Sequence, residues 1–419
     1  MPLSDRIHVI FHCARNRGCE VLAIGEKKRI LQNVRRPIAG ARFYGYDFAP
    51  TPRDKVSRDL WTTENALRRG RAVAACLKKL RAESFIPDVI YGHPGWGEML
   101  HVRDVFPNAR VINYCEFYFN RDGQDYGFDP EFPDSDPDGF RIRTENMAQL
   151  ASLVGADAGI SPTLWQRSRY PELFQERISV IHDGIDLDIV KPDAIARVHL
   201  PQKSLTLTKA NQVITYVSRN LEPYRGFHIF MRALPEIQRR LPHAHVLIVG
   251  GDDVSYGRPS DTGTYREKYL AEVGTRIDMS RVHFLGRLAY ADYLRVLQIS
   301  TAHVYLTYPF VLSWSMLEAM AVGATVIGSR TAPVQEVIET GRNGLLVDFF
   351  SHDELVESIV HVCESGAGMD AVRHASIATV RERFSLRDGC LTRQLDILGV
   401  STASVRRDGV TASATSALP

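Results

Sequence analysis

The residues best suited to chemistry lie in one stretch, Tyr305–Ser329, where a strand leads through a loop into a helix. The apolar run Ala302–Leu306 predicts a buried parallel strand, and Ser313 or Ser315 can cap the helix that follows. A helix N-terminus offers free N–H groups and a partial positive charge, which suit a phosphate. Glu318 lies in the first turns of this helix, so its carboxylate could accept two hydrogen bonds from a vicinal diol such as a ribose. The stretch therefore predicts a site for a ribose and its phosphates.

The segment LEAMAVG resembles the donor-binding segment of the family 4 retaining glycosyltransferases of the GT-B fold. The usual pattern of that family is a glutamate, seven residues, and a second glutamate followed by Ala-Met-Ala, and Glu318 matches the second glutamate. Phe310 stands at the place of the first, so the carboxylate that this family usually aims at the donor sugar is absent. The resemblance implies that Glu318 binds the ribose and that the helix start holds the phosphates. The residues that it assigns to the donor there are Ser313, Trp314, Ser315, Met316 and Leu317.

Two arginines match the paired cations of the same family, in the loop SRNLEPYRGF that follows the predicted strand Val213–Val217. Arg219 corresponds to the first cation, usually an arginine, and Arg225 to the second, usually a lysine before glycine. Two cations at the mouth of a strand can neutralise a departing diphosphate. Further donor contacts are expected in two turns after later strands, at Gly251, Arg287 and Leu288.

His93 is the best site candidate in the first part of the chain. It follows the predicted strand Pro87–Gly92 in the sequence YGHPGWGE, and in family 4 enzymes a histidine after the corresponding strand commonly faces the donor sugar. The resemblance therefore places His93 with Arg219 and Arg225 as a catalytic residue. The alternative is a histidine that only hydrogen-bonds a loop carbonyl.

Two acidic motifs could hold a metal ion, but neither is expected to do so. Asp134–Glu145 matches the calcium-loop pattern D-x-D-x-D-G-x5-E, yet the prolines just before it forbid the entering helix that such a loop needs. We expect its carboxylates to cap a helix over Phe140–Val154. Asp186 and Asp188 form a D-x-D motif in a segment that resembles the turn at the end of the family's first domain, so a turn is expected there. Neither a metal nor another cofactor is predicted.

The composition is that of an ordinary globular protein. The chain has 419 residues, and 51 basic against 49 acidic side chains give a formal charge of +2, which implies no nucleic-acid partner. The six cysteines include no CxxC pair, so they predict neither a zinc site nor a disulfide framework. No apolar run approaches the ~20 residues that span a bilayer, and Met1–Asp5 does not begin a signal peptide, so the cytoplasm is expected.

One predicted helix, Glu64–Ala82, carries a basic face with Arg68, Arg71, Lys78 and Lys79. Such a face could touch acidic lipid, which would give a peripheral contact with the inner membrane surface. The alternative is a face that is simply solvated.

Strands and helices alternate along the chain. This alternation predicts an α/β fold of two doubly wound, Rossmann-like domains that face each other across a cleft, as in the GT-B fold. The predicted divisions are an acceptor-side domain at 1–199, a nucleotide-sugar domain at 200–375, helices that cross back to the first domain at 376–400, and a disordered tail at 401–419.

Three segments depart from this regular plan. Asp193–Ala210 is expected to be a polar linker, and Val254–Gly263 looks like an insertion that could form a mobile rim. Near the N-terminus, Asp5–Arg17 is predicted to be a helix, followed by the strand Glu20–Ile24. Members of the family usually begin with a strand and a glycine-rich turn before this helix, so the chain looks short at its start.

The resemblance implies a metal-independent, retaining, hexosyl-type glycosyltransferase. It would move a sugar from a UDP- or GDP-linked donor to a hydroxyl of a glycan, a lipid-linked acceptor or a small molecule. Two alternatives stay open. One is a nucleotide-sugar-binding protein without transferase activity, suggested by Phe310 and by the short start, and the other is a GT-B sugar-nucleotide epimerase.

Overall fold

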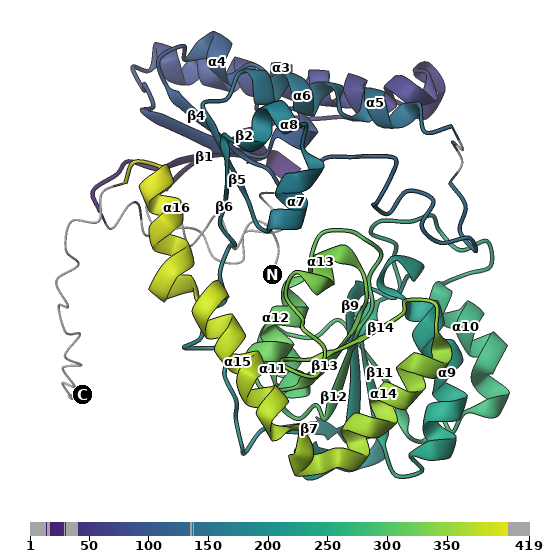
Figure 1. Cartoon of the computed structure of the whole chain (residues 1–419). Helices are drawn as coiled ribbons and strands as arrows, with labels where there is room; N and C mark the ends of the chain where they lie inside the picture. Colours follow the sequence, from purple (N-terminus) through teal and green to yellow (C-terminus); the bar gives the residue numbers. More distant parts are fainter. Residues whose placement is uncertain are drawn as a thin grey trace, which may run out of the picture.

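The computed structural model describes residues 14, 17–28, 30, 41–134, 136 and 138–400. These residues form two α/β domains, each built on its own parallel sheet, which lie one above the other in Figure 1. The predicted helix Asp5–Arg17 falls almost entirely outside the described residues, and the predicted tail 401–419 lies wholly outside them. Within the described ranges, no helix has both the length and the apolar character needed to cross a membrane.

The N-terminal domain has a four-stranded parallel sheet of order β3-β4-β5-β6 and a separate parallel pair, β1-β2. Its strands are β1 (Leu22–Glu26), β2 (Arg42–Tyr46), β3 (Val89–Gly92), β4 (Arg110–Tyr114), β5 (Ala158–Ser161) and β6 (Ile178–Val180). Its helices are α3 (Trp61–Ala82), α4 (Val102–Val105), α5 (Arg141–Glu145), α6 (Met147–Val154), α7 (Leu164–Arg169) and α8 (Glu172–Gln175). Side chains alternate across β4, so Val111 packs with α3 and α4 while Ile112 packs on the opposite face of the sheet.

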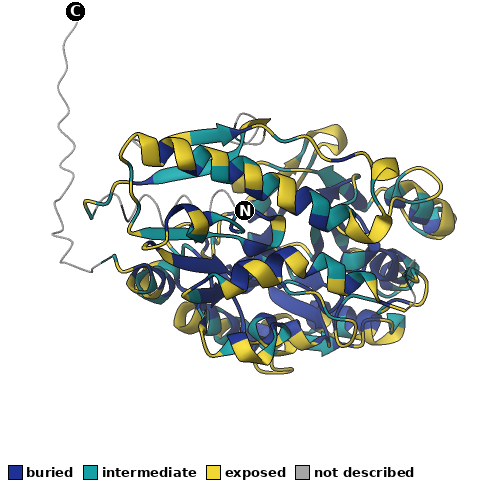
Figure 2. Ribbon diagram, turned by 90° about the horizontal axis from the view of Figure 1, so that it is seen from above, coloured by how far each residue is buried: buried dark blue, intermediate teal, exposed yellow. Residues whose placement is uncertain are grey.

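The C-terminal domain has a six-stranded parallel sheet of order β11-β10-β9-β12-β13-β14. Its strands are β9 (Val213–Asn220), β10 (His245–Gly251), β11 (Val282–Gly286), β12 (Ala302–Tyr305), β13 (Thr325–Ser329) and β14 (Leu345–Val347). Its helices are α9 (Phe227–Arg240), α10 (Tyr265–Val273), α11 (Tyr290–Gln298), α12 (Trp314–Ala321), α13 (Ala332–Gln335), α14 (His352–Ser365) and α15 (Asp370–Phe384). The central strands are buried, whereas the helices around them show exposed residues on their outer sides (Figure 2). The predicted two-domain α/β fold is confirmed.

The last helix of the described chain crosses back to the N-terminal domain. A helical turn over Leu386–Cys390 runs into α16 (Leu391–Ile397), and Leu395 packs in the same core as Ile112. The Gln394 side chain donates to the carbonyl of His182 at 3.0 Å. This helix therefore ties the end of the described chain to the N-terminal domain.

The segment Asp193–Ala210 is not the polar linker that we expected. It contains an antiparallel hairpin of β7 (Arg197–Leu200) and β8 (Leu205–Thr208). Alternate side chains, including Leu207, pack against Val213 and Leu247 of the large sheet. The linker prediction was wrong because each strand has four residues, too few for its alternation to stand out among polar neighbours.

The helix predicted over Phe140–Val154 is interrupted at Asn146, where α5 ends and α6 begins. The Asn146 amide group accepts from the backbone N–H of Phe119 at 3.2 Å and donates to its carbonyl at 2.8 Å. The Asp136 carboxylate accepts from the Arg141 backbone N–H at the start of α5, which confirms the expected capping role.

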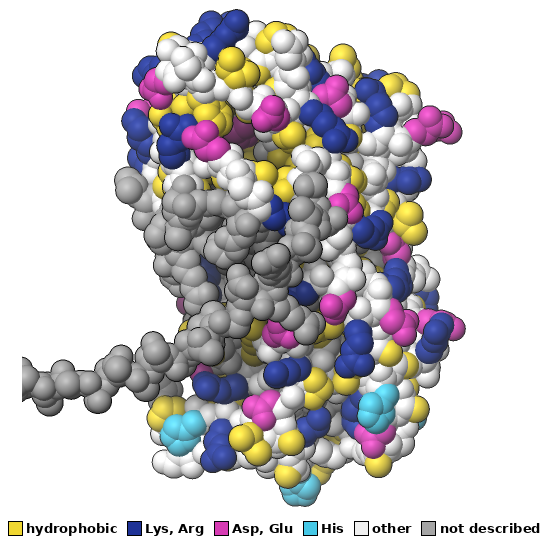
Figure 3. Space-filling model, turned by 90° about the vertical axis from the view of Figure 1, so that its left-hand side faces the viewer, with side chains coloured by type: hydrophobic (Ala, Val, Ile, Leu, Met, Phe, Trp, Pro, Cys, Tyr) yellow, Lys and Arg dark blue, Asp and Glu magenta, His cyan; other side chains and the backbone are white. Residues whose placement is uncertain are grey.

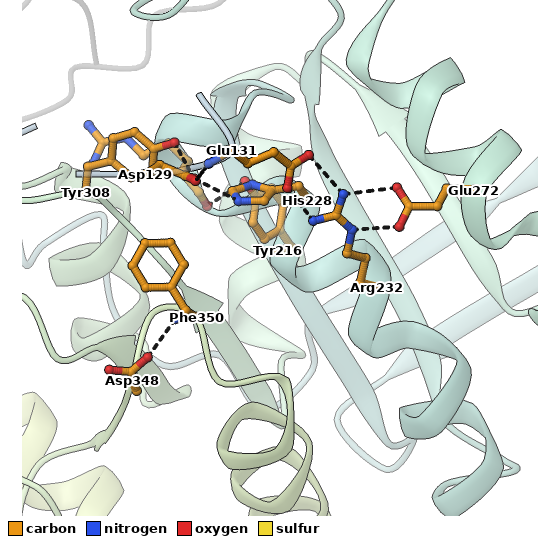
Figure 4. A network of polar contacts seen from close by, with 10 residues as sticks. Asp129, Glu131, Tyr216, His228, Arg232, Glu272, Tyr308, Asp348 and Phe350 are labelled. Carbon is orange, nitrogen blue, oxygen red and sulfur yellow. Dashed lines mark hydrogen bonds and ion pairs between the residues drawn. The ribbon is translucent and has the colours of Figure 1, made fainter. Parts of the chain in front are cut away.

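A segment between β4 and α5 leaves the N-terminal domain and lies against the C-terminal domain. We call residues 125–131 the docking segment. The Asp129 carboxylate accepts a hydrogen bond from the Tyr308 hydroxyl at 2.6 Å, and its Oδ2 lies 3.0 Å from Nε2 of His228 (Figure 4). The side chains of Asp129 and His228 are 2% and 1% exposed, so this is a buried contact between the domains.

Residues before and after Asp129 also bind the docking segment to the C-terminal domain. The Tyr224 hydroxyl donates to Asp125 at 2.5 Å. Arg232 bridges Glu131 and Glu272, with a nitrogen-to-oxygen distance of 2.6 Å to each (Figure 4). Because these contacts join residues far apart in the sequence, they set how the two domains lie against each other.

The substitution Asp129→Asn should lower the free energy of unfolding by roughly 3 kcal/mol, because it removes one partner of a buried pair. Burial alone would raise the pKa of Asp129, but hydrogen bonds from His228 and Tyr308 outweigh burial and lower it. The ionised carboxylate therefore stabilises the fold fully above the ordinary aspartate pKa of about 3.9. This stabilisation is lost as the pH falls through the lower pKa of the folded state.

Denaturant unfolding between about pH 3 and pH 7 measures this effect. The variant should be less stable at neutral pH and should lose less stability on acidification than the wild type. Glu131→Gln is the matched control, since it breaks a partly exposed pair in the same segment and should cost about 1 kcal/mol or less. Equal effects of the two variants would contradict the role assigned to Asp129.

Candidate active site

The candidate site lies where the large sheet reverses its winding. β10 and β11 extend from β9 in one direction, and β13 and β14 extend from β12 in the other. In an open parallel sheet, ligands bind beyond the carboxyl ends of the two strands at such a switch point. Arg219 lies near the end of β9 and Arg225 shortly after it, and the loop into α12 follows β12. The topology therefore brings the predicted cations and the predicted helix start to one edge.

Arg225 is buried, with 9% of its surface exposed, and its contacts are to neutral groups. Its guanidinium donates to the Thr307 hydroxyl at 2.7 Å, to the Tyr305 hydroxyl at 3.2 Å and to the Val311 carbonyl at 3.2 Å. Within the part of the chain that the structure describes, no carboxylate lies within ion-pair distance of this guanidinium. Arg219, by contrast, is exposed at the end of β9.

The Tyr305 hydroxyl joins Arg225 to the start of α12. It accepts a hydrogen bond from the backbone N–H of Ser313 at 2.7 Å while it contacts the Arg225 guanidinium. Ser313 is the N-cap residue of α12, and its hydroxyl lies 2.9 Å from that of Ser315. The cation and the helix N-terminus are thus held together by one side chain. Trp314 is buried close to the ring of His182, which belongs to the other domain's side of the interface.

Met316 and Leu317 of the predicted site turn their side chains into the core. Both side chains are 0% exposed and pack in the core beneath α12 with Met320 and Val326. Their side chains cannot contact a donor, because the helix turns its apolar face to the sheet. Any contribution from these two residues is limited to their backbone groups.

Glu318 is buried on α12 and is held by two tyrosines of α11. The Tyr290 hydroxyl donates to one carboxylate oxygen at 2.7 Å, and the Tyr293 hydroxyl donates to the other at 2.5 Å. Burial and the nearby carboxylate raise the pKa of both tyrosines, so both hydroxyls remain protonated donors. A carboxylate oxygen can accept more than one hydrogen bond, so the tyrosines alone do not exhaust this group.

Gly251, at the end of β10, allows a close approach of polar side chains. A Cβ at this position would lie 2.6 Å from Nε of Arg287 and 2.8 Å from Oδ1 of Asn220. The Arg287 guanidinium donates to Asn220 at 2.8 Å and to Asp253 at 2.5 Å. Leu288, the next residue, is half-buried against the core of the large sheet. Gly251 and Arg287 therefore lie together at the carboxyl ends of β10 and β11.

Phe310 lies in an aromatic cluster that joins the domains. Its ring centroid is 4.7 Å from that of Phe117 and 4.8 Å from that of Tyr256. Tyr256 belongs to Val254–Gly263, the predicted mobile rim. The first part of this segment is instead held in place by Glu222. Its buried carboxylate accepts hydrogen bonds from the backbone N–H groups of Ser255 and Tyr256 at 3.0 and 3.1 Å.

His93 lies at the carboxyl end of β3, in the N-terminal domain. Its Nδ1 accepts a hydrogen bond from the Gly95 backbone N–H at 3.0 Å, and its Nε2 lies 3.4 Å from a Glu116 carboxylate oxygen. The ring stacks on Trp96 with a centroid distance of 4.5 Å. The loop contact that we considered as an alternative role is thus present, although its partner is an amide and not a carbonyl.

The acidic motifs have other partners. Arg387 forms ion pairs with Asp186 at 3.2 Å and with Asp188 at 3.0 Å, which ties the turn to the segment that crosses back. Arg141 lies 3.4 Å from Asp134 and 3.3 Å from Glu145 in the calcium-like motif. Over the described ranges, no three His, Cys, Asp or Glu side chains are placed to hold a metal ion.

Several site residues are absent from the sequence-based prediction. Tyr290 and Tyr293 are spaced to share one face of a helix, which is the only local signal that they act together. Tyr305 was expected only as part of a buried strand, and Glu222 lies between the two predicted cations with no motif to mark it. Their roles come from contacts between elements, which spacing within one element does not reveal.

Two family models match the chain. The model described as "Glycosyl transferase family 4 group" matches residues 17–190, and the one described as "Glycosyl transferases group 1" matches residues 211–365. The D-inositol 3-phosphate glycosyltransferase of Corynebacterium urealyticum is 28% identical over 218 residues, which are 51% of this chain and 49% of that protein. The chain thus spans about half the length of the curated relatives that it matches.

Solved structures show the fold. The sucrose-phosphate synthase of Thermosynechococcus elongatus matches with a TM-score of 0.69 at 20% identity, over 93% of this chain and 92% of that one. Anabaena HepE in complex with UDP matches with a TM-score of 0.64 at 16% identity, over 95% and 96% of the two chains. The predicted GT-B fold is confirmed by these likenesses.

Replacing Glu222 should release the segment that carries Tyr256. Glu222→Ala removes the acceptor of the Ser255 and Tyr256 backbone N–H groups, which should then exchange their hydrogens at least about tenfold faster, because one lost hydrogen bond is worth roughly 1.5 kcal/mol. Hydrogen exchange followed by mass spectrometry over residues 254–258 measures this. Exchange in β9 serves as the internal control, and unchanged exchange of the segment would refute its anchoring by Glu222.

Proposed function

We propose that this chain, which belongs to glycosyltransferase family 4, transfers a sugar from a nucleotide-diphosphate donor to an acceptor hydroxyl with retention at the anomeric carbon. The transferred group would be a hexose-type sugar on UDP or GDP. HepE forms complexes with UDP and with UDP-glucose, which supports a nucleotide sugar as the donor here. The acceptor would be a glycan, a lipid-linked molecule or a small molecule.

The observation that carries this proposal is the buried Arg225 beside the start of α12. A buried charge is costly unless an opposite charge accompanies it, and the partners of Arg225 are hydroxyls and a carbonyl. These groups orient the guanidinium, and the buried Glu222 carboxylate acts on its charge only from beyond ion-pair distance. A diphosphate at the switch point would supply the missing negative charge, and the N-terminus of α12 would add to its binding.

The remaining residues take roles around this diphosphate. Arg219 would approach from the end of β9, and Glu318, fixed by its two tyrosines, would accept hydrogen bonds from the ribose hydroxyls. The turns at Gly251 and at Arg287 would lie near the base. His93 would face the donor sugar from the N-terminal domain.

The chemistry would need no side-chain nucleophile. The acceptor oxygen would bond to the anomeric carbon on the face from which the diphosphate leaves, as the bond between that carbon and the phosphate oxygen breaks. The leaving phosphate would take the proton of the acceptor hydroxyl. The two arginines would stabilise the negative charge that develops on the diphosphate, so no metal ion would be required.

The domain boundaries belong to the same proposal. Residues 1–199 would bind the acceptor, residues 200–375 would bind the donor, and residues 376–400 would tie the two together. The protein would act in the cytoplasm.

A second candidate function is supported by Phe310. Its ring packs in the aromatic cluster, so no carboxylate faces the donor sugar from this position, and a nucleotide-sugar-binding protein without transferase activity would also fit. Incubation with a panel of nucleotide sugars, followed by assays for free nucleotide diphosphate with and without acceptors, separates the two. Donor binding without release of diphosphate under any condition would favour the second function.

Arg219→Ala should lower turnover about a hundredfold while leaving the donor affinity nearly unchanged, because its contact would strengthen as the diphosphate departs. Arg219 is exposed, so the variant should fold normally. Arg225→Ala should lose as much turnover, and Arg225→Lys, which keeps the charge, should recover part of it. Melting temperatures control for the burial of Arg225. Near-normal turnover of both alanine variants, or loss of activity in EDTA with rescue by manganese, would overturn the mechanism.

Glu318→Ala should weaken donor binding by roughly 1.5–3 kcal/mol for each lost hydrogen bond to the ribose. Calorimetry with the nucleotide diphosphate measures the affinity. Tyr293→Phe, which leaves the carboxylate in place, is the matched control and should have a smaller effect. An affinity unchanged by Glu318→Ala would remove the ribose assignment.

A further inference from the structure

Tyr305 is the last residue of β12, and packing fixes its side chain. The residue is 2% exposed and lies in the same core cluster as Leu312 and Leu317. Side chains in a close-packed core have little freedom to move. The Tyr305 hydroxyl therefore has a defined position at the carboxyl end of its strand, where the candidate site lies.

Two hydrogen-bond donors already occupy the acceptor positions of this hydroxyl. Nη1 of Arg225 lies 3.2 Å from the hydroxyl oxygen, and the backbone N–H of Ser313 donates to the same oxygen at 2.7 Å. A hydroxyl group has two acceptor positions and one hydrogen of its own. The hydrogen of Tyr305 must therefore point away from both Arg225 and Ser313.

That hydrogen has no acceptor within the residues that the structure describes, where the Tyr305 hydroxyl makes only the two hydrogen bonds that it accepts. Burial raises the pKa of Tyr305, so the hydroxyl stays protonated at neutral pH. A buried hydrogen-bond donor without an acceptor is unfavourable. The arrangement therefore favours an acceptor that comes from a bound molecule.

Arg225 also keeps hydrogens for a bound acceptor. Among the described residues, its contacts with Tyr305, Thr307 and Val311 use three of the five N–H hydrogens of a guanidinium. On the face of the molecule seen in Figure 3, basic and acidic side chains lie interspersed over both domains. Arg225 differs from such surface charges, because it is buried and its hydrogen-bond partners are neutral. An anion is the acceptor that suits this position best.

We propose that the Tyr305 hydroxyl donates a hydrogen bond to the diphosphate of the nucleotide sugar and is thus a further catalytic residue. The hydroxyl contacts both the Arg225 guanidinium and the start of α12, so a diphosphate that binds to both would lie next to it. Negative charge grows on the diphosphate as the sugar leaves, so this hydrogen bond would strengthen in the transition state. The hydroxyl would keep its proton, since the leaving phosphate takes the proton of the acceptor hydroxyl and needs none from Tyr305.

This inference rests on the proposed function, from which it takes the diphosphate as the ligand. Binding of a diphosphate can be measured without sugar transfer, however, so the two can fail separately. Calorimetry of the full chain with UDP, GDP and inorganic pyrophosphate measures the binding. Release of nucleotide diphosphate from nucleotide sugars measures the turnover.

Tyr305→Phe removes only the hydroxyl and keeps the ring that packs in the core. It should weaken binding of the tightest of these three ligands about tenfold, because a hydrogen bond to a charged group is lost. It should lower turnover by a larger factor, because that hydrogen bond strengthens as the diphosphate leaves. Thr307→Val is the matched control and should have the smaller effect, since the Thr307 hydroxyl also accepts from Arg225, at 2.7 Å, but belongs to a residue that is 0% exposed. Circular dichroism checks that both variants fold.

NMR of the full chain with its tyrosines labelled with ¹³C at Cζ tests the contact directly. The Tyr305 signal is identified by its loss in Tyr305→Phe. It should shift when the tightest of the three ligands is added to the wild type, and it should still shift in Thr307→Val.

The outcomes separate this inference from the proposed function. Equal affinities of the wild type and Tyr305→Phe, equal losses in the two variants, or an unshifted Tyr305 signal with the ligand bound would overturn the role of Tyr305 and leave the proposed function standing. The expected losses and shift without sugar transfer to any acceptor would support Tyr305 as a diphosphate ligand and refute the transfer. A wild type that binds none of the three ligands would overturn both.

Discussion

The attachment of the docking segment to the C-terminal domain is the constraint on which the arrangement of the two domains depends. Burying the Asp129 carboxylate is costly unless donors satisfy it, and Tyr308 and His228 do so at 2.6 and 3.0 Å. Both donors belong to elements that also carry the candidate site. Tyr308 follows β12, and His228 lies in the first turn of α9, close behind Arg225. Moving the N-terminal domain away would therefore remove the hydrogen-bond donors of the buried Asp129 carboxylate. It would also disturb the loops that hold Arg225.

Burial of an arginine among neutral partners is the constraint that shapes the site itself. Arg232 shows the usual solution, since two carboxylates bracket its guanidinium and neutralise it. Arg225 has hydroxyls and a carbonyl instead, with the Phe310 ring centroid 5.8 Å from its Cζ. A carboxylate in place of that ring would lie close enough to compete with an anionic ligand for the guanidinium. The aromatic residue at this position thus keeps the positive charge available.

The sequence predicts those elements in which apolar residues recur at short, regular spacing. The buried strands at β9 and β12 and the capped helix α12 follow from apolar spacing and turn residues within about twenty positions, whereas the crossing helix α16 was expected from the family resemblance. The hairpin β7-β8 is missed because its strands are short. The contact between Asp129 and Tyr308 joins residues 179 positions apart. The hydrogen bonds from Tyr290 and Tyr293 to Glu318 join the helices α11 and α12. No local pattern encodes either of these, because each depends on how separate elements pack.

The exposed layer of the N-terminal domain is connected to the same docking segment. The chain leaves β4, makes the buried contacts at Asp129 and returns to α5, which passes directly into α6. The contacts of Asp129 with Tyr308 and His228 therefore couple this layer of helices to the C-terminal domain. Because Tyr308 follows β12 and His228 comes three residues after Arg225, a shift of this layer would also move the loops that hold the buried cation.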